Sequence, residues 1–587
     1  MLLTISFFIS LAIFIAGIAF SLSLFKNKKV KAGLNSFYIF ASSVFVSAVV
    51  IFFPIYYSAF NSDRFDIIKA IILSIHNTIR LFIVDGEFNI ITDNVFRDFG
   101  IYELYTLLSA LLFVIAPLLT FGFVLSFFKN ILSHYRLILN RNSDIFVFSE
   151  LNEKSVALAK SIDANKKKKL IVFTDVFEKN EEENFELISA AKNIGAIYLK
   201  KDIAELNLKT HSNKKSLSFF VIGEDDTENI TQTLKLIYKY KQFDKSSLFL
   251  FSKSVESELL ISSVDKGEMK VRRINDSQSL VFRNLYDNGA KIFDDAHIVD
   301  ENYKVISAFV VGMGSCGIEM IKALPWFCQM DNYHLYINAF DKDILAESKF
   351  RSLCPELMDS KYNGNHDNIE DAMYEININS GIDVLSYDFD KLISLADTAT
   401  YVLVSLGDDD LNIRVSLKIR QIFESKGIHP RIQTVIEGTQ QDKELSELSN
   451  FKGQKLNIEF IGDIESSYSE EVVLHSDVEK IALDRHLKWG EEKDFWNYEY
   501  NYRSSVASAI HSKMKKYCNV PGACKKPEER TNDEKQNLRL LEHRRWNAYM
   551  RSEGYSYAAV RNDLAKQHNC LVPFSMLSES DKMKDDD

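Results

Sequence analysis

The chain has 587 residues, a net charge of −11 at pH 7 and 46% hydrophobic residues. This length exceeds one hydrophobic core and predicts three or four domains. The acidic balance gives no general attraction to nucleic acid, so we expect no nucleic-acid partner. The six cysteines lack paired spacing and fit no common zinc pattern, which predicts reduced thiols and no metal site.

Three long apolar stretches predict a helical membrane domain over residues 1–130. Residues 2–25, 37–60 and 104–128 are each long enough to cross a bilayer, which takes about 20 residues. A cleaved signal peptide is the alternative interpretation of the first stretch. It is disfavoured because no basic residue precedes the apolar run, which is also long for such a segment.

Basic residues near the predicted spans indicate the orientation of the chain. The segment between the second and third spans is net acidic, whereas the segments that follow the first and third spans are basic. The basic residues are Lys26, Lys28, Lys29, Lys31, Lys129, Arg136 and Arg141. We therefore expect a protein of the cell's inner (plasma) membrane, with its N-terminus outside and its C-terminal domains in the cytoplasm.

Residues 65–84 have isoleucines at helical spacing, interrupted by polar side chains, which predicts an amphipathic helix. In one interpretation this helix lies in the outer membrane interface. In the other it lines a pore, with His76, Asn77 and Arg80 facing water. The glycines of the outer segment, Gly86 and Gly100, are isolated, so the sequence does not predict a potassium filter of the Thr-Val-Gly-Tyr-Gly kind.

Residues 143–290 and 303–465 repeat one order of short apolar strands and helices. This pattern predicts two tandem Rossmann-like α/β domains, each with a buried parallel sheet, that arose by duplication. A Gly-Asp-Asp-x-x-Asn segment follows the fourth strand of each copy, ending at Asn229 (with one extra residue) and at Asn412. It resembles the domain that regulates potassium conductance, which is found in Trk-type uptake regulators and in ligand-gated channels. The resemblance implies dimers or rings below the membrane.

Only the second copy contains a complete Gly-x-Gly-x-x-Gly segment, formed by Gly312, Gly314 and Gly317 between a strand and a helix. Asp341 follows at the end of the next strand, where an acidic side chain can bond a ribose hydroxyl. These residues predict a nucleotide site at the helix N-terminus. The alternative is that the glycines serve only the strand-helix turn. The first copy has Glu150 and Glu153 instead, which would repel phosphate.

Residues 471–587 form a small, mainly helical segment rich in aromatic and basic side chains. The order of its residues resembles the ryanodine-receptor repeat, through His543, Trp546, Gly554, Tyr557, His568, Leu571 and Val572. The sequence departs from that pattern with Glu542 and His543 adjacent, Tyr555 for a tryptophan, Ala558 for a glycine and Asn569 for a proline.

The resemblance implies a pocket that holds an adenine nucleotide between aromatic rings. An NAD-like compound and an ADP-ribose-derived ligand are further candidates for this pocket. Trp546 would stack on the base, and the opposite wall would come from Trp496, Tyr500 or Tyr502. Phosphates would meet Arg503, Arg545 and Arg561. The other residues assigned to this site are His543, Tyr549 and Tyr557. The alternative is that these aromatic residues form only the core of the domain.

Neither α/β copy shows a nucleophile-base pair or a metal cluster, so we expect no enzyme and no catalytic residue. The combination of parts is similar to bacterial effectors proposed for nucleotide-signalled antiviral defence. It predicts a homo-oligomeric, ligand-gated membrane effector or channel, because three spans are too few to enclose a pore. The alternatives are a regulator or channel of potassium or other cation transport, a membrane-anchored nucleotide-processing enzyme, and a non-conducting scaffold.

Overall fold

The computed structural model describes most of the chain, in two compact units. The described residues are 1–26, 30–60, 65–95, 100–139, 143–165, 169–175, 185–208, 215–300, 303–359, 373–438, 450–451, 454–474 and 477–585. The first unit contains residues 1–141 and 175–200, and the second contains residues 142–174 and 201–587. Of the residues used to predict the orientation, Lys28, Lys29 and Arg141 lie outside the described residues.

The first unit contains the predicted apolar helices, as α1 (Leu2–Lys26), α2 (Val30–Ala59) and α5 (Tyr102–Leu139). Each is long and apolar enough to cross a membrane, over Leu2–Ser21, Tyr38–Ala59 and Tyr102–Gly122. The prediction of three apolar helices is therefore confirmed, and it indicates a membrane-associated protein. The unit also contains α3 (Asp66–Phe82), α4 (Asn89–Asn94), α7 (Phe185–Asn193) and β3 (Ile197–Leu199).

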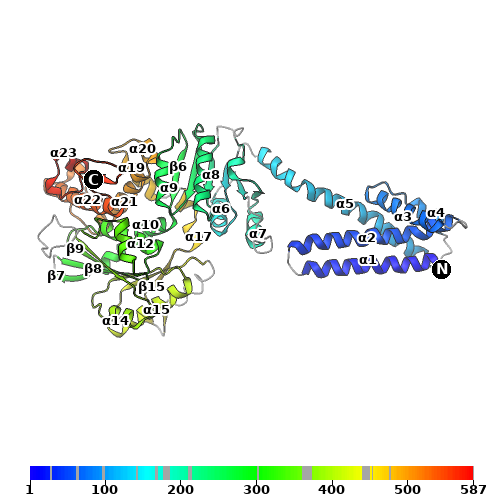
Figure 1. Ribbon diagram of the computed structural model, residues 1–587, viewed down its shortest axis with the longest axis horizontal. Coiled ribbons are helices and arrows are strands. Elements are labelled where there is room, and N and C mark those ends of the chain that lie inside the picture. Colours follow the sequence, from blue (N-terminus) through cyan, green and yellow to red (C-terminus); the bar gives the residue numbers. More distant parts are fainter. Residues whose placement is uncertain are drawn as a thin grey trace. The chain divides into compact units, whose positions relative to one another are not determined.

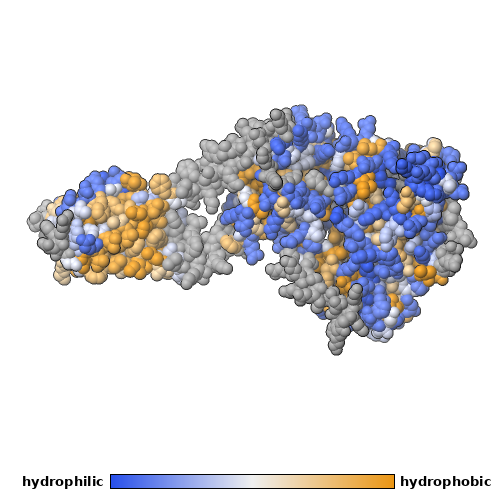
Figure 2. Space-filling model, turned by 180° about the vertical axis from the view of Figure 1, so that it is seen from behind, coloured by the Kyte–Doolittle hydropathy of each residue, from blue (hydrophilic) through white to orange (hydrophobic). Residues whose placement is uncertain are grey.

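Small and polar residues join α1, α2 and α5. The Ser10 hydroxyl donates to the Ser47 carbonyl at 3.0 Å, and the Ser47 hydroxyl donates to the Ser10 carbonyl at 3.1 Å. The Tyr105 hydroxyl donates to the Ile51 carbonyl at 2.6 Å. Hydrogen bonds of this kind suit helices packed in an apolar solvent. Apolar side chains also gather on the outer surface of these helices (Figure 2).

The second unit begins with a parallel sheet, here called the first sheet. Its strands in this unit follow the order β2-β1-β4-β5-β6, and all four of their pairings are parallel. The strands are β1 (Asp144–Phe148), β2 (Lys169–Thr174), β4 (Leu217–Val221), β5 (Ser246–Phe251) and β6 (Lys270–Ile274). The helices of this region include α6 (Glu153–Asn165), α8 (Asp226–Tyr240), α9 (Val255–Ser262) and α10 (Asp276–Asn288).

The second sheet repeats this order, as β10-β9-β8-β11-β12-β15, with β7 (His297–Asp300) antiparallel beside β8. The parallel strands are β8 (Tyr303–Val311), β9 (Tyr333–Asp341), β10 (Tyr374–Ser380), β11 (Tyr401–Val404), β12 (Arg431–Val435) and β15 (Ile458–Ile461). Its helices are α12 (Ser315–Phe327), α13 (Ala346–Leu353), α14 (Tyr387–Ser394) and α15 (Asp409–Ser425). Parallel α/β architecture is therefore confirmed for both regions.

The asparagines of the repeated Gly-Asp-Asp-x-x-Asn segments form equivalent hydrogen bonds in both sheet regions. The Asn412 side chain donates from Nδ2 to the Val435 carbonyl at 2.8 Å, at the end of β12. The Asn229 side chain donates from Nδ2 to the Phe251 carbonyl at 3.1 Å, at the end of β5. Each asparagine thus fixes the start of a helix to the end of the strand that follows that helix.

The C-terminal helices share one hydrophobic core with the second sheet. They are α19 (Asp477–His486), α20 (Glu492–Asn497), α21 (Glu499–Tyr517) and α22 (Asn532–Ser552). Both α21 and α22 pack against α12 (Figure 1). Ile510 and Tyr549 belong to the same core as Met320 and Trp326. A separate core, formed with α14 and α15, covers the opposite face of the second sheet.

The helix α21 begins at Glu499. Residues Tyr500, Tyr502 and Arg503 are therefore helical, and helical geometry points their side chains in different directions.

Candidate ligand-binding pocket

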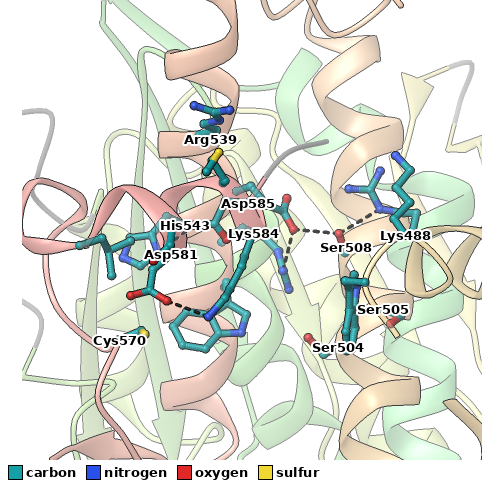
Figure 3. Close-up of a pocket in the computed structure, with 18 of the residues that line it drawn as sticks. Lys488, Ser504, Ser505, Ser508, Arg539, His543, Cys570, Asp581, Lys584 and Asp585 are labelled. Atoms are coloured by element: carbon teal, nitrogen blue, oxygen red, sulfur yellow. Dashed lines mark hydrogen bonds and ion pairs between the residues drawn. The ribbon is translucent and has the colours of Figure 1, made fainter. Parts of the chain in front are cut away.

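A pocket with a volume of about 1150 Å³ lies within the C-terminal helical segment. The helices α19, α21 and α22 contribute to its wall, together with the chain after residue 560, which includes β17 (Gln567–His568) and α23 (Glu579–Lys582). Figure 3 shows Ser504, Ser505 and Ser508 on one side, facing His543, Asp581 and Lys584 across the pocket. All lining residues lie between positions 485 and 585.

The lining has a strong excess of positive charge. Among the described residues, the lining contains eight basic side chains and three acidic ones, although the whole chain has a net charge of −11. The basic residues are Arg485, Lys488, Arg530, Lys535, Arg539, Arg545, Arg561 and Lys584. The acidic residues are Glu542, Asp581 and Asp585. This arrangement attracts anions to the pocket.

Glu542 on α22 connects Ser508 of α21 to the basic residue Arg545. Its Oε1 accepts hydrogen bonds from Ser508 Oγ at 2.8 Å and from Arg545 Nη2 at 2.7 Å. Ser508 Oγ in turn accepts from Arg485 Nε at 3.0 Å. Burial alone would raise the pKa of Glu542, but the charges of Arg545 and Lys515 hold it well below its ordinary value. Glu542 is therefore ionised and fixes Arg545 in place.

Within the part of the chain that the structure describes, two buried groups of the lining have polar atoms without a hydrogen-bond partner. Arg545 is 3% exposed, and its Nε and Nη1 have no such partner among the described residues. Ser505 is 4% exposed, and its hydroxyl also has none there. Buried donors are nearly always satisfied in folded proteins, and a bound ligand is one way to satisfy them. A guanidinium with two unused nitrogens suits a phosphate or carboxylate.

Aromatic rings form another part of the wall. The Trp546 ring lies 4.9 Å from the His568 ring, edge to face, and 5.9 Å from the His543 ring, stacked. Burial, followed by the nearby charge of Arg561, lowers the pKa of His568 to about 4. His568 is therefore neutral near pH 7. Burial raises the pKa of Tyr500, which keeps its hydroxyl protonated.

The structure brings together half of the residues predicted for ligand binding. Those that line the pocket are Tyr500, His543, Arg545, Trp546 and Arg561. Those outside its lining are Trp496, Tyr502, Arg503, Tyr549 and Tyr557.

The second group has other contacts. Tyr549 is buried against Trp326 of α12, and Arg503 forms ion pairs with three glutamates. Lys270 lies over the Trp496 ring at 4.7 Å, and Arg272 lies over the Tyr502 ring at 4.7 Å. Tyr557 is 52% exposed.

Several lining residues were not predicted from the sequence. Lys535 and Arg539 precede Trp546 by eleven and seven residues on α22, which places all three on one helical face. That signal was present in the sequence. Arg485, Ser505 and Lys584 come from other elements, and no local spacing connects them to Trp546.

The glycine-rich loop lies between β8 and α12. Gly312 has φ +95°, and a Cβ there would lie 2.2 Å from the Ser405 carbonyl oxygen. A Cβ at Gly317 would lie 1.9 Å from the Gly312 carbonyl oxygen. The backbone itself therefore requires both glycines. At Gly314, by contrast, the nearest atom would be 3.9 Å away, so the turn does not require a glycine there.

The Asp341 carboxylate lies beside this loop and is held by backbone groups. Its Oδ2 accepts from the Met313 amide at 2.7 Å, and its Oδ1 accepts from the Asp343 amide at 2.8 Å. In the first sheet, the loop after β1 has no glycine-rich segment, and a side chain of that loop accepts a backbone hydrogen bond. Ser149 Oγ accepts from the Ile222 amide at 2.9 Å, which ties the loop after β1 to the end of β4.

The three pore candidates all lie on α3 but have different surroundings. Asn77 is buried, whereas His76 is exposed. Arg80 forms ion pairs at 2.9 Å with Asp85 and with Glu87.

Comparison with protein-family models gives no match for this chain, and comparison with curated proteins gives none. We therefore infer the function from the chemistry of the pocket and of the apolar helices.

Proposed function

We propose that the chain is a ligand-gated membrane effector whose C-terminal pocket binds a nucleotide-derived anion. The excess of basic side chains around this pocket, in an acidic chain, carries the proposal. A guanidinium group can bind a phosphate through two parallel hydrogen bonds, and an indole face such as that of Trp546 stacks on a base. The combination favours a ligand that contains both a phosphate and a base.

The size of the pocket supports a ligand larger than a mononucleotide. Pockets for small molecules have volumes of about 300–1,000 Å³, and this one has a volume of about 1150 Å³. ADP-ribose-like and NAD-like compounds fit this space better than AMP. The resemblance to the ryanodine-receptor repeat supports the same class, because His543, Trp546 and His568 of that pattern line the pocket.

Coupling to the membrane requires that the ligand binds two arrangements of the protein with different affinity. The α22 helix contributes to the pocket with one face and packs on α12 with another. Ligand binding at Trp546 and Arg545 therefore acts on a helix that is part of the core of the second sheet. We propose that this shared core transmits binding to oligomers of the chain.

A regulator of cation transport, gated through its α/β domains, is the second candidate function. Both sheets place their first and fourth strands side by side, which is the switch point of Rossmann-like folds where ligands bind. The open space at Gly314 favours close approach of a phosphate to the N-terminus of α12. In this case the regulating nucleotide would bind at the glycine-rich loop.

Calorimetric titration of the full-length protein in detergent tests the pocket. We expect at least one of ADP-ribose, NAD, ATP and cyclic AMP to bind, and Trp546→Ala to abolish that binding. Trp496→Phe is the matched control, because Trp496 lies outside the lining, and it should bind normally. Normal binding by Trp546→Ala, or no binding by the wild type, would contradict the proposal.

Proteoliposomes then test the membrane function. The ligand identified by titration should release a small fluorescent dye or ions from vesicles that contain the wild type but not Trp546→Ala. Binding without release would favour the scaffold. Conversion of the nucleotide during incubation, measured by chromatography, would favour the enzyme.

A further inference from the structure

The helix α3 extends along α2 into the predicted membrane layer. At its start, Lys69 Nζ lies 5.6 Å from the centre of the Phe60 ring, and at its end the Phe82 ring lies 5.8 Å from the Phe45 ring. Phe45 precedes Phe60 by fifteen residues, or roughly 22 Å of helix. The α3 helix therefore runs antiparallel to α2 and reaches far into the apolar stretch Tyr38–Ala59.

The chain then returns to the end at which it entered. The Phe88 ring lies 5.2 Å from the Phe113 ring of α5, and Tyr105 near the start of α5 bonds Ile51. A helix that enters beside α2 and a chain that returns to the start of α5 form a re-entrant segment. Such segments occur in membranes only where protein or water surrounds their polar groups.

Two faces of α3 suit an apolar environment. Its small and polar side chains pack inward, and Ser74 and Thr78 donate to the carbonyls of Ala70 and Ser74 at 2.6 and 2.8 Å. One exposed face consists of isoleucines: Ile67, Ile68, Ile71, Ile72, Ile75 and Ile79. This pattern is the reverse of that of a water-exposed helix, and we assign the isoleucine face to lipid.

A third face of α3 is polar. Lys69, His76 and Arg80 are separated by seven and four residues, so they follow one side of the helix. At the deep end, Arg80 bonds the carboxylates of Asp85 and Glu87, which remain 65% and 62% exposed. Charged groups at this depth are strongly disfavoured in lipid and are found facing water or protein.

We propose that this polar face, formed by Lys69, His76, Arg80, Asp85 and Glu87, lines a water-filled path between copies of the chain. This inference rests on the proposed membrane function, and it specifies the surface at which permeation would occur. A second copy is required because one chain has too few helices to enclose a path. One arginine against two carboxylates leaves a net negative charge at the deep end, which favours cations.

Cysteine labelling in proteoliposomes tests the proposal. His76→Cys and Ile75→Cys are matched variants, because both parent residues are exposed and neighbours on α3. The native cysteines all lie between positions 316 and 570, and the three that are not buried, Cys518, Cys524 and Cys570, are replaced by serine. A charged thiol reagent on both sides of the bilayer reaches only thiols in contact with water.

We expect complete labelling of His76→Cys and no labelling of Ile75→Cys, with both thiols reacting after denaturation in detergent. Equal labelling of the two variants, or an unreactive His76→Cys, would overturn the proposal. A monomeric mass in detergent and in the bilayer would also overturn it. Because labelling needs no ligand, its failure is distinguishable from a failure of the nucleotide pocket.

Discussion

Arg503 Nη1 on α21 lies 2.9 Å from Oε2 of Glu553, just after the end of α22, and the two side chains are 8% and 10% exposed. Arg503 also pairs with Glu258 of α9 at 2.7 Å, and Glu553 with Lys322 of α12 at 3.5 Å. One buried ionic network thus joins the C-terminal helices to helices of both sheet regions. Ser504 and Ser505, which follow Arg503 on α21, line the candidate pocket.

Glu553→Gln should destabilise the protein strongly. The change leaves the buried Arg503 and the mostly buried Lys322 with less negative charge beside them, and breaking a buried pair costs about 3–5 kcal/mol. Denaturant unfolding of the full-length protein measures this loss. Glu579→Gln is the control, because its pair with Lys582 leaves Glu579 77% exposed, and it should change stability by less than about 0.5 kcal/mol. Equal effects of the two changes would contradict the interpretation.

Acid should remove the stabilisation provided by Glu553. Burial alone would raise its pKa, but the charges of Arg503 and Lys322 outweigh this effect and lower the pKa to about 2. The folded-state pKa lies below the ordinary value of 4.5, so the contribution is complete above that value and is lost as the pH falls toward 2. The midpoint temperature of thermal unfolding should therefore fall less between pH 6 and pH 3 in Glu553→Gln than in the wild type.

Arg545 and Ser505 should contribute unequally to ligand affinity. Arg545→Lys removes the planar pair of unused nitrogens and should weaken binding by about 1.5–3 kcal/mol, the range for hydrogen bonds to charged groups. Ser505→Ala removes one hydroxyl and should weaken binding by about 1 kcal/mol. Titration of both variants with the ligand that Trp546 recognises checks this order. Unchanged affinity in Arg545→Lys would place the anion elsewhere.

The glycine-rich loop permits a separation of structural and binding roles. Gly312→Ala forces a side chain into a left-handed conformation against Ser405 and should destabilise the protein by at least about 1–3 kcal/mol. Gly314→Ala meets no atom within 3.9 Å and should leave stability unchanged. If a nucleotide binds at this loop, Gly314→Ala should lower its affinity. Unaltered nucleotide binding in Gly314→Ala would show that these glycines serve only the turn.

The charge at the deep end of α3 should control ion preference. Glu87→Lys changes the cluster of Arg80, Asp85 and residue 87 from a net negative to a net positive charge. The reversal potential under a salt gradient should shift from cation toward anion preference. Glu103→Lys, at the start of α5 and outside this cluster, is the control. A reversal potential that Glu87→Lys leaves unchanged would separate the cluster from the conducting path.

Periodic hydropathy predicted the three apolar helices and the α/β regions, because both signals are local. Helical spacing also placed His543 and Trp546 together correctly. Tyr549 could not be assigned in this way, because the sequence does not reveal that this face of α22 packs against Trp326. The contributions of Arg485 and Lys584 depend on chain segments about a hundred residues apart, which only the tertiary fold brings together.

The shared core of α12, α21 and α22 bears on how the C-terminal helical segment can be moved between proteins. A fragment of residues 471–587 would expose Ile510 and Tyr549, which are buried in the full chain. Such a fragment would be prone to aggregate, and a chimaera that carries it should include the second α/β region as well. The C-terminal helices and the second sheet are therefore one structural unit, and insertions or exchanges between them should be poorly tolerated.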